Sequence, residues 1–243
     1  MRVRNSIYAQ TQTKDNYKKD KRITPKQWKV YYYLLGISKF NSQQVEDHRY
    51  IYRKDLNISQ ACRDLGIKST QTFYNAIEKL QDRKLIRKTE QYYLIYAQNW
   101  ISVDKNVLTN LVKFAKTREK DIDLLRTFLI LKKMDKIADS SAEKSFTLRQ
   151  ICVLLGHGDT NADYYASIRF YLALLCFWGL IELTQHKQYC DGFGAYTVYH
   201  LQAVKETDLN ADFESDIKGE MNAPLPSTEL MNKLKFVIPE MIE

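Results

Sequence analysis

Residues 57–86 read NISQACRDLGIKSTQTFYNAIEKLQDRKLI, and this stretch decides the fold. Asn57 is placed to cap a short helix, with Gln60 three residues later as a capping-box-like partner. Gly66 supplies the left-handed backbone that a sharp turn between two helices needs. The stretch therefore predicts a short helix, a tight turn, a second helix and the entry into a strand.

The second of these helices has one apolar and one polar side. Ser69 is placed to cap it, and its inward positions recur at helical spacing, at Phe73, Ile77 and Leu80. The side chains that point outward near its N-terminus are Thr70, Gln71, Thr72, Tyr74 and Asn75. A helix-turn-helix whose second helix is rich in hydrogen-bonding groups has the shape that enters a DNA major groove.

The elements on either side of this stretch predict a winged helix. Residues 23–28 contain a capping pair, Thr24 with Gln27, and a proline at the first helical position, so a helix is expected to start there. A short strand is expected at residues 50–52, and two short β segments follow the second helix. Their hairpin is expected to be small, because its bend contains no glycine. We place this domain at residues 23–103.

The chain repeats this unit. A shift of 90 residues places residues 146–156 (FTLRQICVLLG) on residues 56–66 (LNISQACRDLG). Beyond the turn the shift becomes 95 residues, which aligns Leu175 with Leu80 and fits a longer turn, HGDTNAD, in the second copy. A larger hairpin is expected over residues 182–202. A unit that recurs in this way predicts two copies of one fold.

Four parts make up the predicted layout. Residues 1–22 form a basic arm that is either a flexible tail or a segment that orders on nucleic acid. The first winged helix, residues 23–103, is followed by a connecting helix and a second winged helix at residues 104–203. Residues 204–243 form an acidic tail with a short amphipathic segment, which packs back on the body or docks a partner. The predicted fold class is mainly α with small β-hairpin wings, as two tandem winged helix-turn-helix domains.

The net charge of +8 is unevenly distributed. Residues 1–100 carry a net charge of +11, residues 101–203 carry +2, and residues 204–243 carry −5. Cations gathered in one part of a chain are the electrostatic footprint of a polyanionic partner. This polarisation favours such a partner for the first hundred residues over a basic surface that is merely solvated.

The sequence lacks the segments that direct a chain into a membrane. No apolar run approaches the roughly 18 residues of a membrane span, and the N-terminus has no apolar block of the signal-peptide type. We therefore expect a cytoplasmic protein, in which the four cysteines are buried thiols because they form no CxxC pair. A metal site built from Cys190, His186 and His200 is the weaker alternative, so neither a metal nor a cofactor is predicted.

Motifs of known catalytic chemistry are missing from the sequence. There is no P-loop, no GxGxxG, no HExxH and no plausible pair of nucleophile and base. The seventeen tyrosines suggest a nucleophile for strand nicking, but such enzymes also need a metal-binding histidine cluster, and the four histidines are scattered. We therefore expect a protein that is not an enzyme.

The polar helix and the hairpin after it are the expected DNA-reading surface. Gln71 and Asn75 carry amides that can read an adenine edge bidentately. Hydroxyls and backbone amides at a helix N-terminus bind phosphate, and cations farther along reach flanking phosphates. The alternative is a polar face that is only solvated. The expected DNA-binding residues are Ser69, Thr70, Gln71, Thr72, Tyr74, Asn75, Lys79, Arg83, Arg87 and Lys88.

The corresponding helix of the second copy has an apolar outer face. Its expected outward residues are Tyr165, Phe170, Tyr171, Ala173, Leu174 and Phe177. Such a face is costly to leave in water, so we expect it to be buried against the first domain, the tail or a second protomer. Contacts to a DNA backbone are still expected from Tyr164, Ser167 and Arg169.

The two copies, LGIKSTQTFYNAIEKLQDRKLI at residues 65–86 and LGHGDTNADYYASIRFYLALLCFWGLI at residues 155–181, resemble known proteins. Over about residues 23–203 the chain is similar to the tandem winged-helix replication initiators of plasmids and to the replisome organisers of phages. Residues Thr70, Gln71, Thr72, Tyr74 and Asn75 match the positions at which such proteins read DNA. The chain departs from the plasmid initiators in its apolar second helix, since their second domain commonly reads the origin repeat.

The resemblance implies partners as well as a fold. Proteins of this kind bind repeated double-stranded DNA sites, and they form a homodimer or switch between a repressor dimer and an origin-binding monomer. A host replication protein is the expected partner of the C-terminal tail. The function expected first is initiation of plasmid or phage replication, by origin binding and recruitment without catalysis. A transcriptional regulator of a mobile element and a non-catalytic assembly adaptor are the alternatives.

Overall fold

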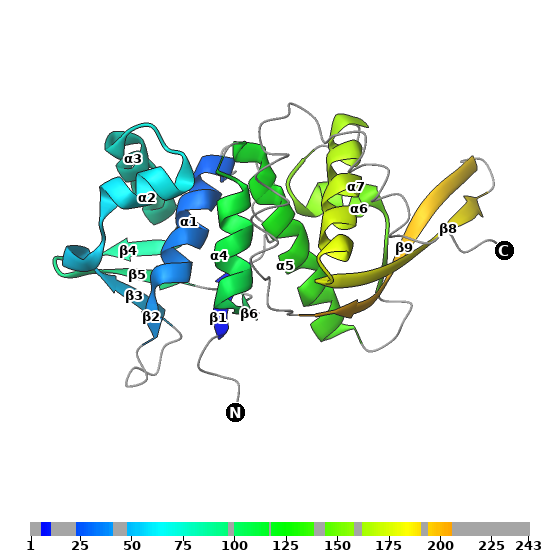
Figure 1. Cartoon of the computed structure of the whole chain (residues 1–243), viewed down its shortest axis with the longest axis horizontal. Helices are drawn as coiled ribbons and strands as arrows, with labels where there is room; N and C mark the ends of the chain where they lie inside the picture. The colour runs from blue at the N-terminus through cyan, green and yellow to red at the C-terminus, as the bar shows by residue number, and fades with distance from the viewer. Residues whose placement is uncertain are drawn as a thin grey trace. The chain divides into compact units, whose positions relative to one another are not determined.

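In the computed structural model the described residues are 6–10, 23–40, 48–96, 100–116, 118–138, 144–157, 162–190 and 194–205. The predictions for the rest of the basic arm and for the acidic tail beyond residue 205 lie outside them. The described residues form helices and small antiparallel sheets, in two compact units at residues 1–125 and 126–243 (Figure 1). Within these ranges, no helix is both long enough and apolar enough to cross a bilayer.

The first long helix of unit 1 is α1 (Pro25–Ile37). Its start confirms the predicted capping box: the backbone N of Gln27 donates to Thr24 Oγ1 at 3.3 Å, and the backbone N of Thr24 donates to Gln27 Oε1 at 2.9 Å. Ile23 and Trp28, on either side of the cap, are both buried. Such a start fixes the direction in which the helix enters the core.

The core of unit 1 is built around an aromatic cluster on α1. Trp28 and Tyr32 stack with ring centroids 5.3 Å apart, and Tyr31 meets both rings edge-on. All three side chains are almost fully buried. The hydroxyl of Tyr31 donates to the backbone O of Tyr96 at 3.0 Å, which satisfies its polar end and ties the helix to a strand.

The stretch at residues 57–86 forms two helices, α2 (Ile58–Leu65) and α3 (Thr70–Asp82). Asn57 caps α2, because its Oδ1 accepts from the backbone N of Gln60 at 3.0 Å. The side chain of Gln60 donates to Asp64 Oδ1 at 2.7 Å. Gln60 is therefore bound along its own helix and does not complete the capping box that the sequence predicts.

Gly66 makes the turn between α2 and α3 with a φ of 64°, as predicted. The turn also lies close to another part of the chain. A Cβ atom built on Gly66 would be 2.3 Å from the carbonyl oxygen of Lys116. Both the left-handed backbone and the lack of a side chain are thus required at this position.

The helix predicted to connect the domains is α4 (Lys105–Phe114), and it belongs to unit 1. It packs against α1 and α2, and its apolar side is buried at Val107, Leu108, Leu111 and Val112. A Cβ atom on Gly36 of α1 would lie 3.6 Å from Thr109 Oγ1, which shows how closely the two helices approach. The boundary predicted between residues 103 and 104 is therefore wrong, because α4 completes the core of the first unit.

A two-stranded sheet joins β1 (Ser6–Gln10) to β6 (Trp100–Asp104) in antiparallel register. The sequence predicted an arm at residues 1–22 without regular structure, and for residues 6–10 that prediction is wrong. Its partner strand lies far along the chain, so no local pattern reveals the pairing.

The main sheet of unit 1 is antiparallel, with strand order β2-β3-β5-β4. Its strands are β2 (Lys39–Phe40), β3 (His48–Tyr52), β4 (Ile86–Lys88) and β5 (Tyr92–Tyr96). Ile51, Ile86 and Ile95 are buried on the face that carries the helices. Figure 1 shows α2 and α3 on one side of these strands.

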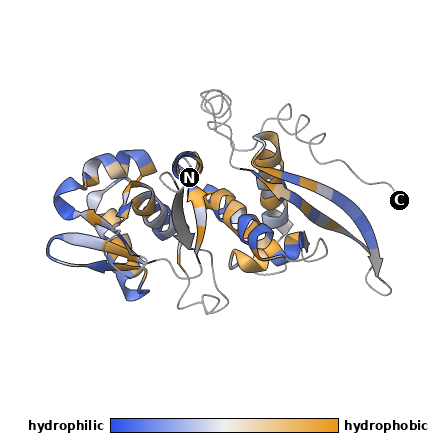
Figure 2. Cartoon of the chain, turned by 90° about the horizontal axis from the view of Figure 1, so that it is seen from below, coloured by the Kyte–Doolittle hydropathy of each residue, from blue (hydrophilic) through white to orange (hydrophobic). Residues whose placement is uncertain are grey.

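Unit 2 has the same order of elements, with a longer second helix and a longer hairpin. Its helices are α5 (Ile122–Ile137), which begins in the last residues of unit 1, α6 (Leu148–Leu154) and α7 (Ala162–Phe177). Its strands are β7 (Ser145–Phe146), β8 (Ile181–Cys190) and β9 (Gly194–Val204), in the order β7-β9-β8. The β8–β9 hairpin is hydrophobic near the helices and becomes hydrophilic toward its tip (Figure 2).

Backbone hydrogen bonds at the turns repeat with the shift of 90 residues that the sequence showed. The backbone N of Ile67 donates to the carbonyl O of Cys62 at 2.8 Å, and the backbone N of His157 donates to that of Cys152 at 3.0 Å. The two cysteines are buried at equivalent positions. The short helix and its turn are therefore built alike in both units.

The ends of the second helices repeat with the shift of 95 residues. Leu85 donates its backbone N to the carbonyl O of Leu80 at 2.9 Å, and Leu180 donates to Leu175 at the same distance. All four side chains are buried. The two units thus share the local geometry at both ends of the helix pair.

Candidate nucleic-acid interface

The N-terminus of α3 is ordered by its own hydroxyl groups. Ser69 caps the helix, since its Oγ accepts from the backbone N of Thr72 at 3.2 Å. The hydroxyls of Ser69 and Thr72 also lie 2.8 Å apart. Thr70, between them in sequence, is exposed. Of the three hydroxyls expected to contact DNA, two thus serve the cap, and that of Thr70 faces solvent.

Two amides form a pair on the exposed side of α3. The Nε2 of Gln71 donates to the Oδ1 of Asn75 at 2.7 Å, one helical turn away, and both residues are exposed. This bond orders both side chains in the absence of a ligand. Each amide keeps further donor or acceptor capacity directed at solvent, which is what reading a base edge requires.

Tyr74, the next exposed side chain on α3, lies near the hairpin. It is 41% exposed, and it interacts electrostatically with the side chain of Tyr93 in β5. Burial raises the pKa of Tyr93, whereas the guanidinium of Arg53, hydrogen-bonded to its side chain, lowers it. Arg53 also donates to the carbonyl O of Glu90 at 3.1 Å. Arg53 therefore connects β5 with the turn of the hairpin.

The hairpin turn confirms the expectation of a small loop without glycine. The backbone N of Thr89 donates to Tyr92 O at 2.9 Å, and Thr89 Oγ1 accepts from Tyr92 N at 3.0 Å. A threonine side chain thus provides the closure that a glycine turn would otherwise give. The loop holds its shape without any residue at positive φ.

Arg87 and Lys88, predicted to act together, lie on opposite faces of the hairpin. Arg87 is paired in register with Leu94, and Lys88 with Tyr93. Successive side chains of a strand point to opposite faces, and Tyr93 is on the buried, helix-bearing face. Lys88 is therefore on the side of α3, and Arg87 faces away from it. That both contact the same DNA stays a prediction, and their opposite orientation favours Lys88 as the contact on the α3 side.

The last turns of α3 carry little positive charge. Lys79 forms an ion pair with Asp82 at 3.4 Å, and both are exposed beside Glu78. Arg83 is half-buried at the end of the helix. Within residues 78–83 the two acidic side chains offset the charges of Lys79 and Arg83, so this end of α3 adds no net positive charge to the expected DNA-reading surface.

Sequence reasoning missed three exposed cations near the helix-turn-helix and the hairpin. Lys68 is exposed in the turn just before Ser69. Arg53 and Lys54 are exposed in the 3₁₀ turn η3 (Arg53–Asp55), which leads from β3 toward α2. The position of Lys68 beside a helix cap was a usable signal. The other two are distant in sequence from the hairpin, and only the folded chain brings them to it.

The equivalent helix of unit 2 does not present a matching surface. Phe170, Tyr171, Ala173 and Leu174 are only 4–9% exposed, as expected for an apolar face that is covered. The same expectation is wrong for Phe177, which is 41% exposed, and Tyr165 is half-buried. Tyr164 stacks on His157 with ring centroids 3.6 Å apart. Burial raises the pKa of Tyr199 of β9, and Arg169, which is exposed and hydrogen-bonds Tyr199, offsets part of that rise. The three residues expected to contact a DNA backbone, Tyr164, Ser167 and Arg169, therefore do not form one exposed cluster.

Groups of ligands for a metal ion do not occur within the described ranges. His186 and His200 stack with ring centroids 4.6 Å apart, but the side chain of Cys190 lies outside the described residues. Cys62 and Cys152 are buried, as expected of the cysteines, whereas Cys176 is half-buried. Burial raises the pKa of Cys176 to about 12, so its thiol stays protonated near neutral pH.

Three kinds of comparison with known proteins found no match to this chain. No protein-family model matches the sequence, and no curated protein and no solved structure is similar to it. The functional assignment therefore depends on the side chains of unit 1 and on their geometry.

Proposed function

We propose that this protein binds double-stranded DNA in a sequence-specific manner, with α3 in the major groove. The observation that carries the proposal is the exposed Gln71–Asn75 pair behind a well-capped helix N-terminus. Bidentate amides are the groups that recognise adenine, and a helix N-terminus favours nearby phosphate. The exposed cations Lys68 and Lys88 on the same side add sequence-independent attraction.

The order of elements supports a winged helix in each unit. In unit 1 the order is α1, β3, α2, α3, β4, β5, with β5 between β3 and β4 in the sheet. In unit 2 the order is α5, β7, α6, α7, β8, β9, with β9 between β7 and β8. Helix, strand, helix-turn-helix and hairpin with this sheet order is the winged-helix plan. The hairpins β4–β5 and β8–β9 are then the wings.

The two units have different roles in this proposal. Unit 1 reads DNA, because its α3 exposes polar groups, whereas the corresponding face of α7 is apolar and mostly buried. We place the protein among initiators of plasmid or phage replication, which act by origin binding and recruitment without catalysis. The replication role rests on the tandem repeat and its resemblance to such initiators.

The test is selection of binding sites from a pool of random DNA duplexes by the full chain, followed by titration of the enriched duplex. We expect one enriched motif, and weaker binding at higher salt because phosphate contacts release counterions. The Gln71→Ala/Asn75→Ala variant should lose about tenfold or more in affinity for that motif, since a bidentate base contact is worth about 1–3 kcal/mol. Asn106→Ala, an exposed amide on α4, is the matched control.

Two results would contradict the proposal. One is a selection that enriches no motif, even at low salt. The other is an enriched duplex that the double variant binds as tightly as the unmodified protein. If the protein binds a motif as expected, footprinting on DNA that flanks the coding region separates an initiator from a regulator, because initiators of this kind bind clustered repeats.

A further inference from the structure

The outer face of the main sheet in unit 1 is lined by tyrosines. Registers place Tyr52 opposite Tyr92 and Tyr50 opposite Leu94, so these four side chains share one face. The alternate residues of the same strands, Ile51, Tyr93 and Ile95, are buried against the helices. The tyrosine face is therefore the side that points away from α3, and we call Tyr50, Tyr52 and Tyr92 the tyrosine platform.

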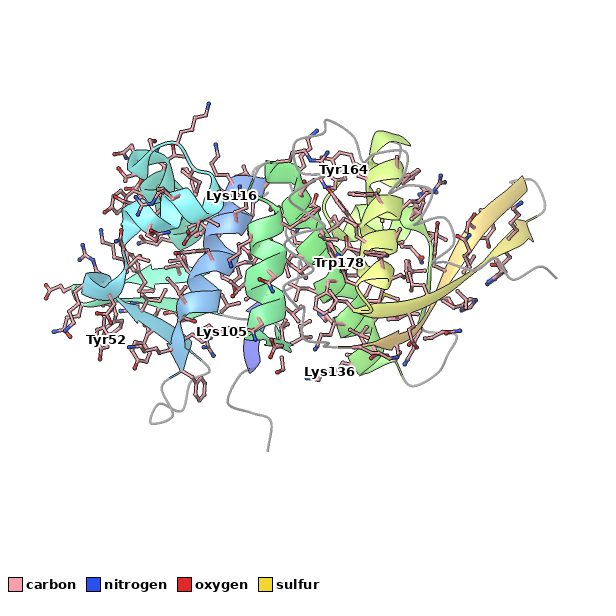
Figure 3. All side chains as sticks on the ribbon, viewed as in Figure 1. Tyr52, Lys105, Lys116, Lys136, Tyr164 and Trp178 are labelled. Carbon is pink, nitrogen blue, oxygen red and sulfur yellow. The ribbon has the colours of Figure 1, made fainter. Side chains whose placement is uncertain are left out.

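Rings of the platform contact one another and remain accessible. The Tyr50 and Tyr52 rings are 5.3 Å apart and nearly perpendicular, and the Tyr52 and Tyr92 rings are 6.5 Å apart in the same arrangement. Tyr52 is 38% exposed, and the other two are half-buried. Figure 3 shows Tyr52 at the edge of the sheet, on the side away from α2 and α3. Three phenol rings thus form a continuous aromatic surface open to solvent.

Exposed cations border the platform. Lys54 Nζ lies 5.9 Å from the centroid of the Tyr52 ring, and Lys39 and Arg87 are exposed on the same face, in register with Tyr50 and Leu94. Asp55, 3.8 Å from Lys39, is the acidic group that the structure pairs with these cations. The platform therefore has a net positive border.

We propose that the tyrosine platform binds single-stranded nucleic acid. Unpaired bases expose π-faces that stack on aromatic side chains, whereas the bases of a duplex are already stacked on each other. Cations spaced around the rings can follow the phosphates of the same strand. A sheet face that combines rings and positive charge fits this ligand better than an apolar protein segment, which gains nothing from the cations.

This site is separate from the proposed duplex-reading surface. Lys88 and Tyr93 lie on the α3 side of the hairpin, and Arg87 lies on the platform side. One unit can therefore hold a duplex on one face and an unpaired strand on the other. The inference does not depend on duplex recognition by α3, so the two can fail independently.

Fluorescence anisotropy with the full chain and labelled oligothymidylate of about 20 nucleotides tests the platform, since sites of this type cover roughly 4–16 nucleotides. We expect salt-sensitive binding, and a loss of about tenfold or more in Tyr52→Ala/Tyr92→Ala. Tyr52→Phe/Tyr92→Phe should bind nearly as the unmodified protein does, because the rings are kept. Lys54→Gln/Arg87→Gln tests the cations without removing a ring, and oligouridylate in parallel shows whether DNA or RNA is preferred.

The outcomes separate this inference from the proposed function. Gln71→Ala/Asn75→Ala should keep its affinity for oligothymidylate, and Tyr52→Ala/Tyr92→Ala should keep its affinity for the selected duplex. Circular dichroism and the thermal midpoint verify that each variant is folded. The inference is overturned if the full chain does not bind either oligonucleotide at low salt. It is equally overturned if folded variants without the rings, or without the cations, bind as tightly as the unmodified protein.

Discussion

Lys84 and Gly179 occupy the same position in the two units, and both have a left-handed backbone, with φ of 57° and 67°. Each follows the second helix of its unit, and each donates its backbone N to a carbonyl three residues earlier, at 2.8 Å in Lys84 and 2.9 Å in Gly179. The turn therefore requires this conformation whichever residue is present. In unit 1 a lysine adopts it at a steric cost that glycine avoids.

Replacing Lys84 with glycine should stabilise unit 1. A non-glycine residue in the left-handed region costs about 1–2 kcal/mol, and part of that gain is offset by the flexibility of glycine in the unfolded chain. We expect Lys84→Gly to raise the free energy of unfolding by about 0.5–1 kcal/mol, measured by urea titration with fluorescence. Lys84→Ala is the matched control, since it removes the charge and keeps the Cβ. Equal effects of the two substitutions would contradict a backbone origin.

Glycines at two turns should respond differently to alanine. A Cβ on Gly66 would lie 2.3 Å from the Lys116 carbonyl oxygen, whereas a Cβ on Gly179 would meet nothing within 4 Å. Both positions have positive φ, so both variants carry the backbone cost of about 1–2 kcal/mol. Gly66→Ala also forces a clash, and we expect it to lose about 2–4 kcal/mol in all. A thermal midpoint of Gly66→Ala that is as high as that of Gly179→Ala would rule out this close contact.

The buried side chain of Arg49 should stabilise unit 1 against unfolding. Arg49 of β3 donates from Nε to Ser38 Oγ and from Nη2 to Ser38 O, both at 2.7 Å, and Ser38 Oγ donates to Leu35 O at 2.6 Å. These bonds satisfy the C-terminal end of α1. Arg49→Met keeps the volume but leaves the Ser38 carbonyl without this donor, which should cost about 1–3 kcal/mol in urea unfolding. Arg63→Met, on the exposed side of α2, should change stability by less than about 0.5 kcal/mol.

The paired histidines of unit 2 should make stability depend on pH. Burial, and then the nearby His186, lower the pKa of His200 below its usual value of 6.5, and Ser145 Oγ lies 2.6 Å from His200 Nδ1. The unfolded chain therefore binds the proton more readily. The contribution to stability is present above about pH 6.5 and is lost as pH falls through the folded pKa. Thermal midpoints from pH 5 to 8 should fall on acidification, and His200→Gln should flatten that fall. An unchanged pH profile in the variant would exclude His200 as the cause.

Local signals explain which parts of the fold were predictable. The Thr24 cap, the Gly66 turn and the Ser69 cap depend on residues within about four positions, so sequence patterns reveal them. The pairing of β1 with β6 and the packing of α4 depend on distant residues, and local patterns missed both. Arg53 likewise contacts the hairpin turn only because β3 ends beside it.

Substitutions on opposite faces of β4 should weaken binding to different nucleic acids, a duplex in one case and a single strand in the other. Arg87 shares the platform side with Leu94, and Lys88 shares the α3 side with Tyr93. Lys88→Gln should weaken binding of the selected duplex across sequences and reduce its salt dependence by about one phosphate contact, because a neutralised phosphate contributes one unit to the slope. Arg87→Gln should leave duplex binding unchanged and weaken oligothymidylate binding. Both variants remove one exposed cation from neighbouring positions, so each is the control for the other. Equal loss of duplex affinity in both would show that the hairpin contacts DNA through its edge or tip, without the division between faces that strand alternation implies.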